Sequence, residues 1–159
     1  MEVLVVYYSR TGNTEKAAEA LAKGMKRAGA SVVVKRVEVV NPSELGKYGL
    51  ICVGTPVHWF RPARRVREFL EKLPNLAGKF GVAFSTYGDL GPGRSLSTIG
   101  KALRGKGARV LGSMTTVAAN YHYKLFVLHK DRPNDDDLRK FEEFGGTVTK
   151  AALGATLTT

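Results

Sequence analysis

Short apolar runs alternate with amphipathic stretches along this chain. Five runs are rich in valine, isoleucine and phenylalanine, as strands buried on both faces are; they span residues 3–8, 31–40, 50–53, 80–84 and 109–117. Four stretches repeat apolar residues at helical spacing; they span residues 14–28, 64–73, 95–104 and 135–152. This alternation predicts an α/β fold, a doubly wound five-stranded parallel sheet with helices on both faces. We expect residues 1–159 to form a single domain.

One segment interrupts the alternation. Residues 118–133 show neither a helical nor a strand period, and connections of this length are uncommon unless they are functional or disordered. The segment contains Tyr121, Tyr123 and Phe126, which is too aromatic for a disordered loop. We therefore expect it to pack on the rest of the molecule, where it could cover a ligand, bind a substrate or form an oligomer contact.

The charge is strongly positive and uneven. Lys and Arg number 25 against 14 Asp and Glu, a formal net charge of +11. The excess lies before residue 131, because the remaining residues hold six acids and four bases. Such a field favours an anionic partner: nucleic acid, an acidic protein, a phosphorylated cofactor or an anionic surface.

Cysteine content and the first apolar run limit the cellular context. The single cysteine, Cys52, excludes an intrachain disulfide and a cysteine-built metal site. The run over residues 3–8 is too short for a signal-peptide core or a membrane span. These features predict a cytoplasmic protein without a membrane span.

The first candidate site is the loop that follows the first strand and opens into a helix. In open α/β sheets, ligands bind beyond the carboxyl ends of the strands. A helix N-terminus offers free N–H groups to phosphate, and nearby hydroxyl and amide groups add donors. An ordinary helix cap would need only one such side chain, so the density of donors favours a phosphate site. The candidate residues are Ser9, Arg10, Thr11, Gly12, Asn13 and Thr14.

Two further loops follow the third and fourth strands. The first is aromatic and suits a planar ligand, although its rings could instead form a small local core; its residues are Thr55, Pro56, Val57, His58, Trp59 and Phe60. The second exposes backbone beside an aromatic ring, although it could be a plain glycine turn; its residues are Thr86, Tyr87, Gly88, Asp89 and Gly91.

Competing site types fit poorly. No Gly-Lys-Ser/Thr loop is present, and the glycines at 88, 91 and 93 follow the fourth strand in the wrong order for a dinucleotide fingerprint. His58, His122 and His129 lack helical pair spacing and accompanying acids, so we expect no metal site. No residue is assigned a catalytic role.

The segment Tyr7-Tyr8-Ser9-Arg10-Thr11-Gly12-Asn13-Thr14 resembles the FMN phosphate loop of flavodoxins. Gly54-Thr55-Pro56-Val57 resembles the second flavin loop of that family, and Thr86-Tyr87-Gly88 the third. The resemblance covers essentially the whole chain. It implies the strand order 2-1-3-4-5, with FMN at the junction of strands one and three; flavodoxin is a standard example of this arrangement.

The resemblance also implies roles within the candidate site. Ser9, Thr11, Asn13 and Thr14 would bind the phosphate, and His58 or Trp59 together with Tyr87 would flank the isoalloxazine ring. The chemistry would belong mainly to the flavin. Many family members have a glycine near position 60, where the peptide reorganises on flavin reduction; here Phe60-Arg61-Pro62 follow Trp59.

Three functions remain open. The first is electron transfer between redox partners, and the alternative is FMN-dependent reduction of quinones or similar acceptors with NAD(P)H, so enzyme activity is left undecided. A basic nucleic-acid-binding domain on the same fold ranks third. A basic rim beside the cofactor would be formed by Arg61, Arg64, Arg65 and Arg67. Such a rim suits an acidic redox partner or the extra phosphate of NADPH, unless it is only a solvated helix face.

Overall fold

The computed structural model describes residues 1–88, 91–122 and 126–157, and only the backbone of residues 120–122 and 126–128. Five parallel strands run in the order β2-β1-β3-β5-β6. They are β1 (Glu2–Tyr7), β2 (Ser31–Arg36), β3 (Leu50–His58), β5 (Phe80–Tyr87) and β6 (Arg109–Val117). With these five strands numbered consecutively, the expected order 2-1-3-4-5 is confirmed.

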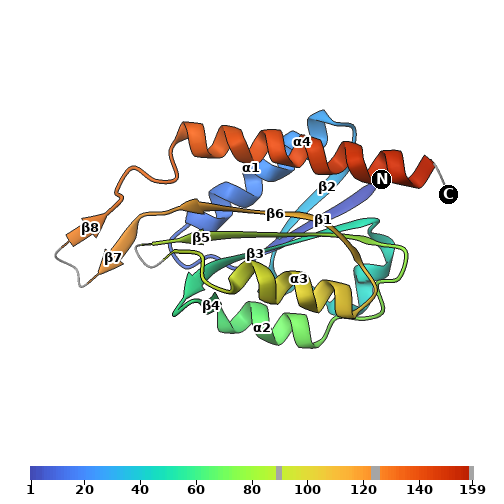
Figure 1. The fold of residues 1–159 in the computed structure, drawn as a ribbon, viewed down its shortest axis with the longest axis horizontal. Coiled ribbons are helices and arrows are strands. Elements are labelled where there is room, and N and C mark those ends of the chain that lie inside the picture. Colours follow the sequence, from blue (N-terminus) through green and yellow to red (C-terminus); the bar gives the residue numbers. More distant parts are fainter. Residues whose placement is uncertain (89–90, 123–125, 158–159) are drawn as a thin grey trace.

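Two helices cover each face of the sheet (Figure 1). On one face lie α1 (Asn13–Arg27) and α4 (Asp135–Leu157), and on the other lie α2 (Arg64–Glu71) and α3 (Ser95–Gly105). The predicted doubly wound α/β fold is therefore confirmed.

The core consists of one hydrophobic layer on each side of the sheet. Successive strand residues point to opposite faces. Leu4 and Ile51 accordingly pack in the layer with α2 and α3, whereas their neighbours Val3 and Cys52 pack in the layer with α1 and α4. All four side chains are fully buried. Burial on both faces explains why these strands appear in the sequence as continuous apolar runs.

Two predicted strand ends were too early. The third strand continues through Gly54–His58, and the fourth continues to Tyr87. Backbone pairing of Thr55 with Ser85 and of Pro56 with Thr86 extends the sheet into segments predicted as loops. These residues are polar or turn-forming, so apolar content alone placed the strand ends at the wrong position.

The second strand is shorter than predicted. It ends at Arg36, and two short 3-10 helices follow, η1 (Val37–Val39) and η2 (Pro42–Lys47). Asn41 accepts a hydrogen bond from the backbone N–H of Ser43 and so caps η2. Valine content extended the strand prediction to residue 40, but no further residue pairs with β1.

Helix α2 ends two residues before its predicted end, and α4 continues five residues past its predicted end. No helix in the described part of the chain is both long and apolar enough to cross a bilayer.

The segment 118–133 contains an antiparallel pair of strands that was not predicted. It consists of β7 (Asn120–His122) and β8 (Phe126–Leu128). Its base is tied to the molecule: the N–H of Ala118 donates to the carbonyl of Tyr87 at 2.7 Å, and Arg132 forms an ion pair with Asp137 of α4. Each strand has only three residues, too few to display a period. Where the side chains of this pair pack lies outside the described residues.

Candidate functional site

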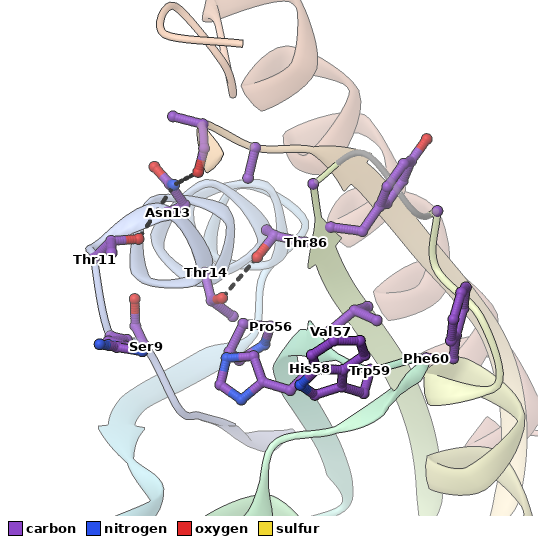
Figure 2. Close-up of a pocket in the computed structure, with 16 residues that line it drawn as sticks. Ser9, Thr11, Asn13, Thr14, Pro56, Val57, His58, Trp59, Phe60 and Thr86 are labelled. Carbon is purple, nitrogen blue, oxygen red and sulfur yellow. Dashed lines mark hydrogen bonds between the residues drawn. The ribbon is translucent and has the colours of Figure 1, made fainter. Parts of the chain in front are cut away.

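A cavity of about 540 Å³ opens at the carboxyl ends of β1, β3 and β5. This is the edge at which parallel α/β sheets bind ligands. Every predicted site residue lines the cavity except Gly12, Thr55 and Asp89, and Asp89 lies outside the described residues. Figure 2 shows the polar residues of the first loop facing the aromatic residues that follow β3 across this space.

The first loop leads directly into α1 at Gly12. Gly12 has a φ of 90°, a left-handed conformation that glycine adopts without strain. No side chain caps the helix, and the first intrahelical bond runs from the N–H of Lys16 to the carbonyl of Gly12. The N–H groups of the first turn have no partner within the helix, so they are available to an anion. Gly12 therefore shapes the loop although it does not line the cavity.

Side chains of the loop are held in place by one another. Ser9 Oγ accepts from the N–H of Gly12 at 3.0 Å. The Asn13 amide donates to Thr11 Oγ1 at 3.3 Å and to the carbonyl of Ala119 at 3.2 Å. These bonds hold the side chains of Ser9, Thr11 and Asn13 in place around the start of α1 (Figure 2).

Thr14 links the first loop to the third. Its hydroxyl lies 2.8 Å from that of Thr86, and both residues are buried. Two residues 72 positions apart thus meet at the floor of the cavity. The sequence placed both in the site but did not indicate this pairing.

The side-chain contacts that support the first loop were not predicted from the sequence. The Arg36 guanidinium, from β2, donates to the carbonyl of Ser9 at 2.6 Å and lies 5.7 Å from the centre of the Tyr7 ring. The Tyr7 hydroxyl donates to Glu15 of α1 at 2.7 Å. Burial, with the nearby Glu15 carboxylate, raises the pKa of Tyr7 to about 12. Tyr7 therefore stays protonated as a donor that joins the strand to the helix.

Trp59 and Phe60 form the turn of a small hairpin between β3 and β4 (Arg61–Pro62). Both have positive φ, 48° for Trp59 and 64° for Phe60. A two-residue hairpin turn requires this geometry, which Asn and Gly adopt far more readily than aromatic residues. Trp59 is 85% exposed and Phe60 47% exposed. The turn therefore holds two aromatic side chains at the lip of the cavity in a strained conformation.

The Thr55 side chain, by contrast, stabilises the hairpin. It is fully buried; its hydroxyl donates to the carbonyl of Pro56 at 2.9 Å and accepts from the N–H of Ala63 at 2.9 Å. Its side chain connects the end of β3 to the start of α2 and does not face the cavity.

The opposite wall comes from the loop after β5 and from the chain after β6. Tyr87, Gly88 and Gly91 line it as predicted, together with Ala118 and Ala119. The alanines were missed because they carry no functional group. The unusual length of the segment that they begin was the one available signal.

The cavity is basic at its rim. Arg10 is the only residue with a permanent charge among the described lining residues. Partial burial of the His58 ring, together with the nearby Arg10 guanidinium, lowers the pKa of His58 below its usual range. His58 is thus a neutral imidazole at neutral pH, suited to contact with an uncharged planar ring.

The flavodoxin family model matches residues 5–144, so the chain belongs to the flavodoxin family. A flavodoxin of Clostridium saccharobutylicum is 27% identical over 86% of this chain and 89% of its own length. The solution structure of the two-electron reduced flavodoxin of Megasphaera elsdenii superposes with a TM-score of 0.74 at 28% identity, covering 93% of this chain and 98% of that one.

A second group of relatives carries a different name. An NAD(P)H dehydrogenase (quinone) of Rhizobium meliloti is 32% identical over 55% of this chain and 53% of its own length. The chain thus spans about half the length of the curated quinone dehydrogenases that it matches.

Family membership makes the chain an FMN-binding redox protein, and the cavity fits this cofactor. An uncapped helix start surrounded by hydroxyl and amide donors suits the phosphate. Aromatic residues on the opposite side suit the isoalloxazine ring, and the volume is typical of a cofactor pocket.

Proposed function

We propose that this protein transfers electrons between redox partners through FMN bound in the cavity at the carboxyl ends of the strands. The observation that carries this proposal is the conjunction of the uncapped first turn of α1 and the aromatic turn at residues 59–60 around one cavity. FMN supplies the redox chemistry and can accept or donate one or two electrons. The protein binds and orients it, and limits the access of water.

At the phosphate end, we assign binding to Ser9, Thr11, Asn13 and Thr14, with the N–H groups of the first helical turn. Arg10 adds a positive charge at the rim. A phosphate dianion interacts favourably with these donors and with the positive end of the helix dipole. Because Ser9 and Asn13 already hold the loop closed, little ordering is needed when FMN binds.

At the ring end, we assign His58 or Trp59 to one side of the isoalloxazine and Tyr87 to the other. Backbone groups near residues 55–60, and those of Tyr87, Gly88 and Gly91 in the described part of the loop after β5, would contact its edges. A neutral His58 can lie against an aromatic plane without the cost of burying a charge.

The double variant Thr11→Ala/Asn13→Ala tests the phosphate assignment. Trp59 is the single tryptophan of the sequence and lies at the cavity lip, so its fluorescence should be quenched when FMN is added. Each lost charge-assisted bond should weaken FMN binding by roughly 1.5–3 kcal/mol.

The matched control is Thr147→Ala, a hydroxyl deletion on the exposed side of α4 that should leave FMN affinity unchanged. Equal FMN affinity in the double variant and the wild type would refute the phosphate assignment.

FMN-dependent reduction of quinones with NAD(P)H is the second candidate, favoured by the names of the relatives that match half of their length. Stepwise photoreduction distinguishes the two functions. Two separate one-electron stages support the carrier; bleaching in a single two-electron stage, together with NADPH-dependent quinone turnover, supports the reductase.

A further inference from the structure

The aromatic turn exposes apolar surface beside the cofactor cavity. The described residues include four large hydrophobic side chains that are exposed: Val39, Trp59, Phe60 and Leu157. Trp59 and Phe60 are consecutive, and both have a backbone conformation that aromatic residues rarely adopt. An exposed aromatic pair on a strained turn gains nothing for folding, and such outliers concentrate at functional surfaces.

Arginines surround this turn. Arg61 follows it directly, Arg64 and Arg65 begin α2, and the N–H of Arg94 donates to the carbonyl of Phe60 at 2.9 Å. The four side chains are exposed. We call these four residues, together with Trp59 and Phe60, the arginine lip.

Among the described residues, acids do not balance the positive charge of the lip. The ion pairs of its described residues involve one carboxylate, Glu68, which lies 2.7 Å from Arg64 and 3.7 Å from Arg65. The Arg64 guanidinium lowers the pKa of Glu68, so this carboxylate is ionised and its charge is shared by two arginines. Residues 61–67 contain four arginines and no acid. The lip therefore carries a positive excess next to the cavity.

We propose that the arginine lip is the docking surface for a small acidic iron–sulfur protein that exchanges single electrons with the bound FMN. This inference rests on the proposed function, because it places a partner against the cofactor assigned above. Tryptophan and arginine are the residues most enriched at the energetic centres of protein interfaces. Excess arginine charge favours a negative partner surface and speeds its approach.

Position favours a redox protein over nucleic acid. Trp59 and Phe60 of the lip line the cofactor cavity, so a partner docked on the lip lies close to the flavin. One electron leaves the reduced iron–sulfur cluster and enters the flavin, so the cluster is oxidised by one electron and the flavin is reduced by one. No covalent bond forms or breaks between the two proteins.

The test titrates the FMN-loaded protein with an acidic [2Fe–2S] ferredoxin at low ionic strength and measures Kd by calorimetry. The lip variant is Arg61→Glu/Arg94→Glu. The control, Lys26→Glu/Lys150→Glu, makes the same change in net charge on exposed residues of α1 and α4. We expect ferredoxin binding to weaken about tenfold or more in the lip variant and less than about twofold in the control.

Two measurements separate this proposal from the proposed function. FMN affinity and photoreduction should be unchanged in the lip variant. If the wild type itself does not bind FMN or cannot be photoreduced, the proposed function is refuted instead. Equal weakening in both variants, or no weakening in the lip variant, overturns the docking surface. Loss of duplex DNA binding in the lip variant, with no ferredoxin binding by the wild type, overturns it in favour of a nucleic-acid interface.

Discussion

The two helical layers of this protein differ in their balance of charge. Helices α1 and α4 together carry seven bases and seven acids, whereas α2 and α3 carry five bases and two acids. Glu142 of α4 bonds both Lys23 and Arg27 of α1, at 2.7 and 2.6 Å. The first layer thus has no net charge, and the second keeps a positive excess of three.

The α1–α4 layer is also distinguished by the close packing of its two helices. Glycines let the backbones of α1 and α4 meet: a Cβ on Gly145 would lie 2.3 Å from the carbonyl oxygen of Leu21, and one on Gly24 would lie 1.8 Å from that of Glu142. Helices that approach this closely have little freedom to rearrange. The α1–α4 layer therefore supports the fold and the start of α1, and the α2–α3 layer supplies the surface available to a partner.

The largest expected effect comes from breaking the α1–α4 contact. Gly145→Val would force a branched side chain into the Leu21 carbonyl, so we expect a loss of about 3 kcal/mol in the free energy of unfolding. Chemical denaturation would measure it. Gly154→Ala in the same helix meets no atom within 4 Å and should be neutral or stabilising by up to about 1 kcal/mol. A similar loss in both variants would contradict this account of the layer.

A smaller effect should follow from Asp137→Asn. Asp137 is 5% exposed, and it accepts hydrogen bonds from Arg132 Nη2 at 2.6 Å and from the N–H of Asn134 at 2.9 Å. Removing its charge should cost about 2 kcal/mol of unfolding free energy, because the bonds to Arg132 lose their charge assistance. Glu68→Gln on the exposed surface of α2 is the comparison in the other layer and should produce no measurable change.

The same carboxylate gives a pH signature. Burial tends to raise the pKa of Asp137, but hydrogen bonds from Arg132 and Asn134 outweigh burial and lower it. Its contribution to stability is present above the unfolded pKa of about 3.9 and is lost as pH falls through the lower folded value. The stability difference between wild type and Asp137→Asn should therefore shrink below about pH 4, as denaturation at several pH values would show. A difference independent of pH would contradict the ion-pair explanation.

The smallest effect is a gain in stability at the basic layer. Trp59→Asn should raise the free energy of unfolding by about 1 kcal/mol, because Asn tolerates positive φ and Trp59 buries little surface. Trp59 is also assigned to the flavin, so ferredoxin binding is compared with both proteins saturated with FMN; it should be weaker in the FMN-loaded variant if the aromatic turn is an anchor. Thermal denaturation and calorimetry test the two effects separately, and a loss of stability would show that the turn is not strained.

Much of the fold could be predicted from periodicity. The strand at residues 109–117 has the predicted bounds, and the apolar run at residues 3–8 corresponds to β1 within one residue at each end. Errors occurred where pairing outweighed local preference. Residues 54–58 contain glycine, proline and histidine, yet they form strand because β5 pairs with residues 54–56 and β4 pairs with residues 57–58.

The part of the candidate site that could be predicted is the part whose binding groups are neighbours in the sequence. The density of donors in residues 9–14 indicated a phosphate loop, and nearly all of these residues do line the cavity. The position of Arg36 in the sequence gave no such signal. Its role in supporting the first loop depends on the pairing of β2 with β1, which brings its guanidinium to the Ser9 carbonyl.

The sequence by itself determined the alternating elements, the two buried faces of the sheet and the resemblance of the first loop to that of the flavodoxin family, because each depends on residues close together in the chain. The tertiary structure alone decided the Thr14–Thr86 contact, the left-handed backbone of Trp59 and Phe60, and the separation of charge between the two helical layers. These features depend on which strands and helices become neighbours. Long-range backbone pairing and close packing set that arrangement, and no local pattern records it.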